Sequence, residues 1–212
     1  SLGEMEYNEQ KKVGDPMIIG IIGAGASGMA AALAAAVNPD VKVLLFERQA
    51  RVGRKLLATG DAKAGQDVVM TKWAGTEGTA ILAKEWEEGL RIYLSADELK
   101  NAQEMKNFLS VGDESVIAFE HGATAMHDAT EGGILGAVWE VAECSGLGVD
   151  VFVENIPVKE ETKKICEAMH IDYLRLISSG TMIIAADHGE ELAVKLQAAG
   201  IEAAVIGKLT EG

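Results

Sequence analysis

The glycine-rich stretch Gly20–Gly28 constrains the fold more than any other part of the sequence. It follows an apolar run that begins at Met17, opens an Ala-rich helical pattern, and is followed by a second apolar run, Val41–Phe46, which ends at Glu47. Strand, glycine turn, helix, strand and acidic residue, in this order, are typical of a dinucleotide-binding βαβ unit. The sequence therefore predicts a Rossmann-like βαβ geometry near the start of the chain.

Each glycine of this G-x-G-x-x-G pattern has a separate physical task. Gly23 permits the tight turn, Gly25 lets backbone N–H groups approach a pyrophosphate, and Gly28 lets helix and strand pack closely. Glu47 is placed to accept a hydrogen bond from a ribose hydroxyl. The predicted cofactor-binding residues are Gly23, Ala24, Gly25, Ala26, Ser27, Gly28, Glu47 and Arg48. A βαβ unit that keeps the turn but holds no cofactor remains an alternative.

Composition and charge narrow the class of protein. The chain has 212 residues, 48% of them apolar and 25% charged, with 24 glycines, which is typical of a globular α/β protein of one large or two small domains. The net charge of −14 is the sum of +1 for residues 1–65 and −15 for residues 66–212, so we expect no nucleic-acid partner for the second part. The apolar segment Met17–Val37 is broken by glycines, which predicts strand plus helix rather than a membrane span.

Cysteine and histidine usage gives no metal centre. Cys144 and Cys166 are the two cysteines, no C-x-x-C occurs, and no histidine stands at ligand spacing, so neither a disulfide framework nor a metal site is expected. A reduced, cytoplasmic protein without a membrane partner fits these features. Cys144 lies in an apolar helical pattern, which predicts an inert core thiol. The isolated histidines are expected at the surface: His121, His170 and His188.

The composition and the predicted elements divide the chain into a polar leader (1–16), the βαβ unit (17–60) and a longer part (61–212), in which strands and helices alternate. Strands are expected at 67–73, 123–126, 149–153, 181–186 and 202–207. One helix is expected to begin at Thr76, which would act as its cap, and another at Ser95, where Glu98 completes a capping box. Further helices are expected at 115–121, 134–142, 159–169 and 189–199. We expect the βαβ unit and the longer part to form one continuous sheet, or two layers sharing an interface.

A first resemblance covers residues 17–60. The run "IIGAGASGMAAALAAA…VKVLLFERQARVGRKLLATG" resembles the N-terminal start of a bacterial FAD-dependent flavoprotein family. This resemblance implies that the segment binds FAD, or another ADP-containing nucleotide, through its ADP moiety. The family continues into an "NGRCN"-like stretch that helps to form the flavin pocket, whereas this chain continues as Asp61-Ala62-Lys63-Ala64-Gly65. Two interpretations of the basic loop 48–55 stay open: it binds a diphosphate, or its side chains are solvated without a ligand.

A second resemblance covers residues 61–212. The runs "DVVMTKWAGTEGTAILA", "AMHDATEGGILGAVWEVA", "ISSGTMIIA" and "AAVIGKLTEG" resemble the C-terminal domain of aminoimidazole-ribonucleotide-synthetase-related proteins, including the hydrogenase-maturation carbamoyl-dehydratase type. The resemblance implies an α/β fold, a synthetase-like α/β sandwich preceded here by the Rossmann-like βαβ unit. Full-length members place an ATP site between this domain and a preceding domain that supplies metal and nucleotide contacts. ATP with Mg²⁺ is therefore expected only with a partner domain.

The second glycine-rich turn, at 127–133, holds the candidate chemistry of the longer part. Imidazole and carboxylate groups can transfer protons, and N–H groups at a strand-to-helix junction can hold a phosphate. The candidate catalytic residues are His127, Asp128 and Glu131, and the candidate phosphate-binding residues are Thr130, Gly132 and Gly133. A glycine-rich helix start without a ligand is the alternative interpretation.

Three functions stay open at this point. The chain is a synthetase-related binding or assembly module that lacks the ATP-binding N-terminal domain and has no turnover on its own, or an ATP-dependent synthetase relative active with a partner domain. The third alternative is an FAD/NAD-binding oxidoreductase fragment that uses Gly23–Gly28. The expected ligand is a nucleotide or phosphate-bearing small molecule. A homo-oligomer is expected because a partner would cover apolar surface left on the 66–212 sheet.

Overall fold

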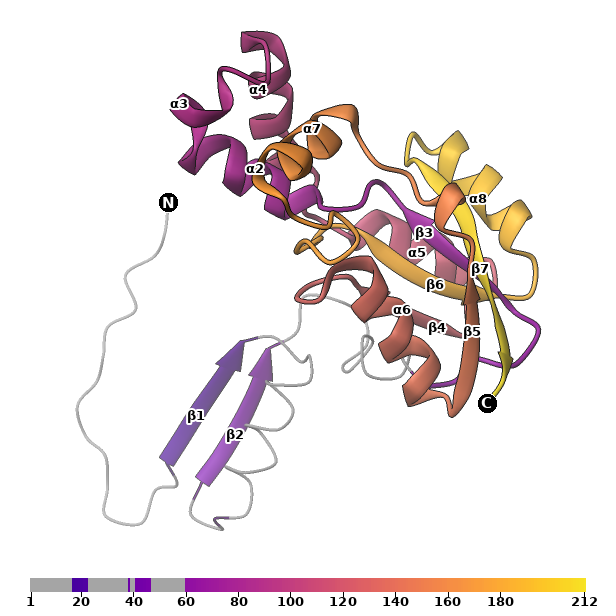
Figure 1. Ribbon diagram of the computed structural model, residues 1–212. Helices are drawn as coiled ribbons and strands as arrows, with labels where there is room; N and C mark the ends of the chain where they lie inside the picture. Colours follow the sequence, from indigo (N-terminus) through magenta and orange to yellow (C-terminus); the bar gives the residue numbers. More distant parts are fainter. Residues whose placement is uncertain (1–16, 23–37, 39–40, 47–59) are drawn as a thin grey trace. The chain divides into compact units, whose positions relative to one another are not determined.

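The computed structural model describes residues 17–22, 38, 41–46 and 60–212, and the chain divides into two compact units, Ser1–Leu56 and Leu57–Gly212 (Figure 1). In the first unit, β1 (Met17–Ile22) and β2 (Val41–Phe46) pair in parallel, with Met17 opposite Val41. Parallel neighbours need a crossover connection, as a βαβ unit has. Both predicted strands are confirmed, whereas the predicted helix and glycine turn lie outside the described residues.

The second unit is built on a five-stranded antiparallel sheet of order β4-β6-β3-β7-β5. Its strands are β3 (Asp67–Thr71), β4 (Ala125–Asp128), β5 (Leu147–Val151), β6 (Met182–Ala186) and β7 (Ala203–Glu211). All five were predicted, with ends that differ by up to four residues. The described strands thus form two sheets, so the expectation of one continuous sheet is wrong.

Helices cover both faces of this sheet. Side chains alternate along a strand, so Val68 and Val69 point to opposite faces and enter different buried clusters. On the Val68 face the cluster includes residues of α6 (Gly133–Cys144), and on the Val69 face it includes residues of α5 (Gly112–Glu120) and α8 (Gly189–Ala198) (Figure 1). The result is a three-layer α/β arrangement.

The remaining helices form a group at one end of the sheet (Figure 1). They are α2 (Thr76–Glu85), α3 (Glu87–Leu90), α4 (Ala96–Glu104), the 3₁₀ turn η1 (Met105–Phe108) and α7 (Glu160–Met169); a further 3₁₀ turn, η2 (Val153–Asn155), follows β5. A third buried cluster holds the group together, including Leu90, Leu99 and Ile165. The predicted capping box of α4 is confirmed, with Ser95 and Glu98 exchanging hydrogen bonds.

Two predictions about single side chains are wrong. Thr76 does not cap α2: the cap residue is Gly75, whose φ of 71° favours glycine, and the Thr76 hydroxyl donates to the Trp73 carbonyl instead. Cys144 is exposed at the end of α6 rather than in the core, because the helix turns that position away from the sheet. The three isolated histidines are exposed, as predicted.

The apolar surface expected on the sheet is not found among the described residues. Both sheet faces carry buried clusters, and the large exposed apolar side chains lie on helices and turns, such as Trp86, Ile92 and Trp139. The reason given for a homo-oligomer therefore fails, because the chain's own helices cover the sheet. Homo-oligomer formation itself stays a prediction.

An ion pair between α4 and α7 predicts a specific pH dependence. The Lys164 ammonium, 2.5 Å from the Glu98 carboxylate, and the Ser95 N–H and hydroxyl lower the pKa of Glu98 from 4.5 to about 2. A carboxyl group with a depressed folded pKa stabilises the folded state above its unfolded pKa, and this contribution is lost as the pH falls toward the folded pKa. We expect Glu98→Gln to lower the urea midpoint by a constant amount above pH 4.5 and by progressively less between pH 4.5 and 2.

Asp97→Asn is the matched control, since Asp97 lies in the same first turn of α4 but pairs with no cation among the described residues. Its effect should not follow the Glu98 titration. An effect of Glu98→Gln that is the same at pH 7 and pH 3 would show that Lys164 does not hold this carboxylate.

Candidate functional site

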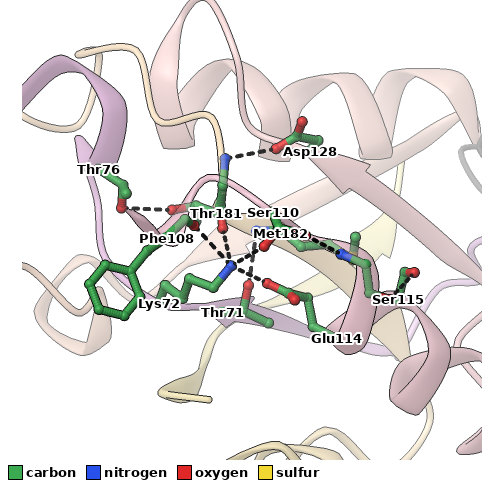
Figure 2. A network of polar contacts seen from close by, with 12 residues as sticks. Thr71, Lys72, Thr76, Phe108, Ser110, Glu114, Ser115, Asp128, Thr181 and Met182 are labelled. Carbon is green, nitrogen blue, oxygen red and sulfur yellow. Dashed lines mark hydrogen bonds and ion pairs between the residues drawn. The ribbon is translucent and has the colours of Figure 1, made fainter. Parts of the chain in front are cut away.

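A buried lysine organises the loops beside the candidate site. Lys72 directly follows β3 with φ 54°, and its side chain is 9% exposed. Its ammonium donates to the carbonyls of Phe108 (3.1 Å), Ser110 (2.6 Å) and Gly180 (2.8 Å) and lies 2.5 Å from the Glu114 carboxylate, which is 3% exposed (Figure 2). A buried charge needs a charged partner and filled hydrogen-bonding positions, and Lys72 has both.

The hydrogen bonds of Lys72 are linked to the candidate catalytic residues through Gly180. The Gly180 carbonyl accepts from Lys72, and the Gly180 N–H donates to Asp128 Oδ1 at 3.2 Å (Figure 2). Asp128 ends β4, where it is half-buried beside His127. His127 Nε2 contacts the Glu140 carboxylate on α6. Strand β4 therefore presents both predicted residues at its end, each held by a different part of the fold.

The segment Leu174–Thr181 meets the starts of both α2 and α6. At α2, the Gly75 N–H donates to Ser178 Oγ (2.8 Å) and the Gly78 N–H to the Ile177 carbonyl (2.9 Å). At α6, the Leu135 N–H donates to the Leu174 carbonyl (3.2 Å). The segment thus satisfies donors at two helix N-termini, which otherwise lack intrahelical acceptors.

The start of α6 requires glycine for two reasons. Gly132 and Gly133 have φ of 85° and 63°, a region that other residues rarely adopt. A Cβ on Gly133 would also lie 2.6 Å from the Leu174 carbonyl oxygen. The Gly133 N–H donates to the Thr130 carbonyl (3.2 Å) and Ile134 is fully buried, whereas Gly132 is exposed and no described residue accepts from its N–H. Among the described residues, the N–H of the exposed Gly132 is therefore the donor at this helix start that remains available to an anion.

Glu131 lies at the edge of this turn with its carboxylate in solvent. Its own backbone N–H and the Thr130 hydroxyl donate to that carboxylate and lower the pKa of Glu131. A negative charge is favourable beside a helix N-terminus. The Glu131 carboxylate therefore lies beside the same helix N-terminus that would attract a phosphate, and the two negative charges would compete for it.

The structure brings together one of the two predicted sets of residues. The second glycine turn forms at a strand-to-helix junction as predicted, with its residues within the single segment His127–Gly133. The first set lies outside the described residues: Gly23, Ala24, Gly25, Ala26, Ser27, Gly28, Glu47 and Arg48.

Sequence reasoning did not single out Lys72, Glu114 or Gly180. A lysine after an apolar strand is ordinarily solvated, and no spacing pattern links it to an acid on α5. The available signal was the position of Lys72 between Thr71 and Trp73, within a run typical of buried sequence. The pairing itself depends on tertiary contacts.

Three general features of the described residues bear on possible functions. No group of three or more His, Cys, Asp or Glu side chains in this part of the chain lies close enough to hold a metal ion. Burial, followed by the nearby Asp172 charge, raises the pKa of Cys166 to about 11, which makes a thiolate nucleophile there unfavourable. None of the described helices has the length and apolar character needed to cross a membrane.

Comparison with known families gives two matches. The family described as "AIR synthase related protein, C-terminal domain" matches residues 51–212. The family described as "NAD(P)-binding Rossmann-like domain" matches residues 21–66, so the two matches overlap. Both resemblances inferred from the sequence are confirmed.

The chain is similar to several curated proteins. It is 32% identical over 94 residues to the carbamoyl dehydratase HypE of Escherichia coli, covering 42% of this chain and 28% of that protein. Against HypE of Rhodobacter capsulatus it is 25% identical over 160 residues, covering 74% and 44%. The chain thus spans less than half the length of these relatives. A 46-residue stretch is 50% identical to a 3-dehydro-bile acid delta(4,6)-reductase of Clostridium scindens, covering 21% of this chain and 11% of the reductase.

Solved structures share the fold. E. coli HypE superposes with a TM-score of 0.61 at 20% identity, covering 93% of this chain and 68% of that one. A thiamine-monophosphate kinase from Stenotrophomonas maltophilia gives 0.59 at 15% identity, covering 92% and 69%. A HypE structure in complex with ATP gives 0.54 at 19% identity, covering 93% and 65%. The mixed α/β arrangement of this chain is therefore that of these proteins.

Proposed function

The chain belongs to the AIR synthase related family through its C-terminal domain, and from this premise we propose that residues 57–212 form one half of a nucleotide- or phosphate-binding site. Its homologues include the carbamoyl dehydratase HypE, and a structural neighbour is HypE in complex with ATP. For this chain we propose a phosphate-bearing small molecule as ligand, and ATP with Mg²⁺ once a second domain completes the site. Alone, the 212-residue chain acts as a binding or assembly module without turnover.

The exposed N–H group of Gly132 at the start of α6, which donates to no described residue, carries this proposal. Oriented N–H groups at the N-terminus of a full-length helix attract phosphate oxygens. The Thr130 hydroxyl lies in the same turn and can donate to such an oxygen in place of the Glu131 carboxylate, to which it donates in the structure. Thr130, Gly132 and Gly133 are therefore the proposed phosphate-binding residues.

The proposed acid–base groups stand next to this anion site. Asp128 is fixed by the Gly180 N–H, and His127 by Glu140, so both are held in place before a ligand arrives. Glu131, by contrast, lies fully in solvent. Phosphoryl or dehydration chemistry needs charge stabilisation in a site closed to water. This open half-site supports the proposal that a partner domain is required for turnover.

Removing the Glu131 charge is expected to strengthen anion binding. Glu131→Gln keeps the shape of the side chain but removes a carboxylate that competes with phosphate for the α6 start. Because the charge is exposed and screened, we expect ADP or inorganic phosphate to bind about two- to fivefold more tightly, from a starting affinity near millimolar. Isothermal titration at low ionic strength measures this.

Glu143→Gln is the matched control, since it removes the same charge from the exposed far end of α6. It should leave the affinity unchanged if the phosphate sits at the helix start. If both substitutions strengthen binding equally, the change in net charge alone explains the effect. If Glu131→Gln binds the anion more weakly, Glu131 itself contacts the ligand.

A second candidate site rests on the first unit. The parallel pairing of β1 and β2, the match to an NAD(P)-binding Rossmann-like domain, and the similarity to the C. scindens reductase all favour an ADP moiety of FAD or NAD there. The proposed contacts are the glycine turn Gly23–Gly28, Glu47 and Arg48. Purified protein that is yellow, or whose melting temperature rises with FAD, would support an oxidoreductase fragment; colourless protein unshifted by FAD, NAD or ADP would exclude it.

A further inference from the structure

An unassigned cavity lies on the helical group and shares no lining residue with the α6 start. It has a volume of about 240 Å³, and its walls include two aromatic rings. The rings of Trp73 and Phe108 meet edge to face, with centroids 5.3 Å apart and an interplanar angle of 87°. The Lys159 ammonium lies 3.9 Å from the centroid of the Trp73 ring. The face of the indole is thus already occupied by a cation from the chain itself.

The cavity wall also carries negative charge. Glu104 and Glu161 line it, and Asn101 donates to Glu161 Oε1 at 3.2 Å. No described carboxylate lies within ion-pair distance of the Lys159 ammonium, which therefore rests on the ring rather than in a salt bridge. A long, flexible lysine without an ion-pair partner can be displaced at little cost. Once displaced, it would leave an aromatic face beside two carboxylates, of which Glu104 also has Lys100 at 3.8 Å and Glu161 pairs with no described cation.

The aromatic wall is held rigidly before any ligand binds. The Trp73 carbonyl accepts from the hydroxyls of Thr76 and Thr181, both at 2.7 Å, and the Phe108 carbonyl accepts from Lys72. Figure 2 shows the Phe108 ring projecting from this network. A preorganised wall lowers the entropy that binding would otherwise cost.

From these contacts we propose that the Trp73 cavity binds an arginine side chain of a partner polypeptide, in competition with Lys159. A guanidinium stacks on an indole face and can also donate to a carboxylate, which matches this combination of walls better than a neutral or anionic group does. The volume is below the roughly 300–1,000 Å³ typical of sites for whole small molecules, and is suited to a single side chain. The net charge of −14 favours the approach of a basic partner.

The test follows Trp73 directly, in the full chain. The probe is the tripeptide Ac-Gly-Arg-Gly-NH₂, and the signal is the indole N–H resonance of Trp73, assigned with Trp86→Phe and Trp139→Phe variants. We expect a saturable shift of this resonance, with about two- to fivefold tighter binding in Lys159→Ala because the internal competitor is gone. Glu104→Gln with Glu161→Gln should weaken binding in that background.

Lys163→Ala is the matched control, because Lys163 is an exposed lysine of α7, the helix that Lys159 precedes as N-cap, and does not line the cavity. This substitution should leave the affinity for the arginine tripeptide the same as in the parent chain. The proposal is overturned if Lys159→Ala shows no saturable shift, if Lys163→Ala strengthens binding equally, or if Ac-Gly-Glu-Gly-NH₂ binds as well. Methylguanidinium binding as tightly as the tripeptide would assign the cavity to a free small cation and overturn a polypeptide partner.

Discussion

Replacing Lys72 with alanine is expected to destabilise the unit of residues 57–212 by about 3–5 kcal/mol. The substitution leaves the Glu114 carboxylate buried without its cation and also removes the donor to the carbonyls of Phe108, Ser110 and Gly180. An uncompensated buried charge costs more than the pair contributes, so the single substitution should be far more damaging than removal of both charges. The loops on either side of Asp128 would lose their common anchor.

Urea denaturation followed by tryptophan fluorescence measures this effect. All three tryptophans, Trp73, Trp86 and Trp139, lie in this unit, so the signal reports on its unfolding. The matched control is the double variant Lys72→Met with Glu114→Leu, which should recover much of the lost stability because no charge is left unpaired. A loss below about 1 kcal/mol in Lys72→Ala would mean that the pair is solvated in solution.

Gly133→Ala is expected to be the most damaging small substitution at the α6 start, at about 2–4 kcal/mol. Two costs add: a left-handed backbone with φ 63°, and a methyl group 2.6 Å from the Leu174 carbonyl oxygen. Backbone atoms cannot rotate aside as a side chain could, so the 174–176 segment would have to move. That shift would break the hydrogen bond from the Leu135 N–H to the Leu174 carbonyl.

The neighbouring glycine separates these two costs. Gly132 also has positive φ, at 85°, but a Cβ there would meet only the Gly136 Cα at 3.4 Å. Gly132→Ala should therefore cost about 1–2 kcal/mol from backbone conformation alone. Chemical denaturation of the two variants side by side gives the comparison. Equal losses would show that the Leu174 segment yields and that Gly133 is required only for its dihedral angles.

The sequence predicted those features of the fold that depend on residues close together in the chain. The Ser95–Glu98 capping box and the glycine turn at His127–Gly133 both form where the pattern indicated, because each depends on neighbours within a few residues. Apolar runs located all five strands of the longer part for the same reason. Their order in the sheet was not predicted, since it depends on which strands meet across the fold.

The predictions that failed depend on distant contacts. Thr76 has the chemistry of a helix cap, yet Gly75 takes that position because the chain must turn tightly beside Leu176 and Thr162. Lys72 and Glu114 give no sign in the sequence that they would be buried together. Cys144 follows an apolar pattern but lies on the outward side of α6. The candidate site is therefore predictable in its turn but not in its supporting network.

ATP turnover by the purified 212-residue chain, with Mg²⁺ present, tests the central proposal most directly. We expect weak nucleotide binding and no phosphate release above the background of a His127→Ala, Asp128→Ala double variant, because residues 57–212 form one half of the proposed site and phosphoryl transfer needs a site closed to water. Measurable hydrolysis by the parent chain that disappears in either His127→Ala or Asp128→Ala would contradict it, and would make this chain a catalyst in its own right.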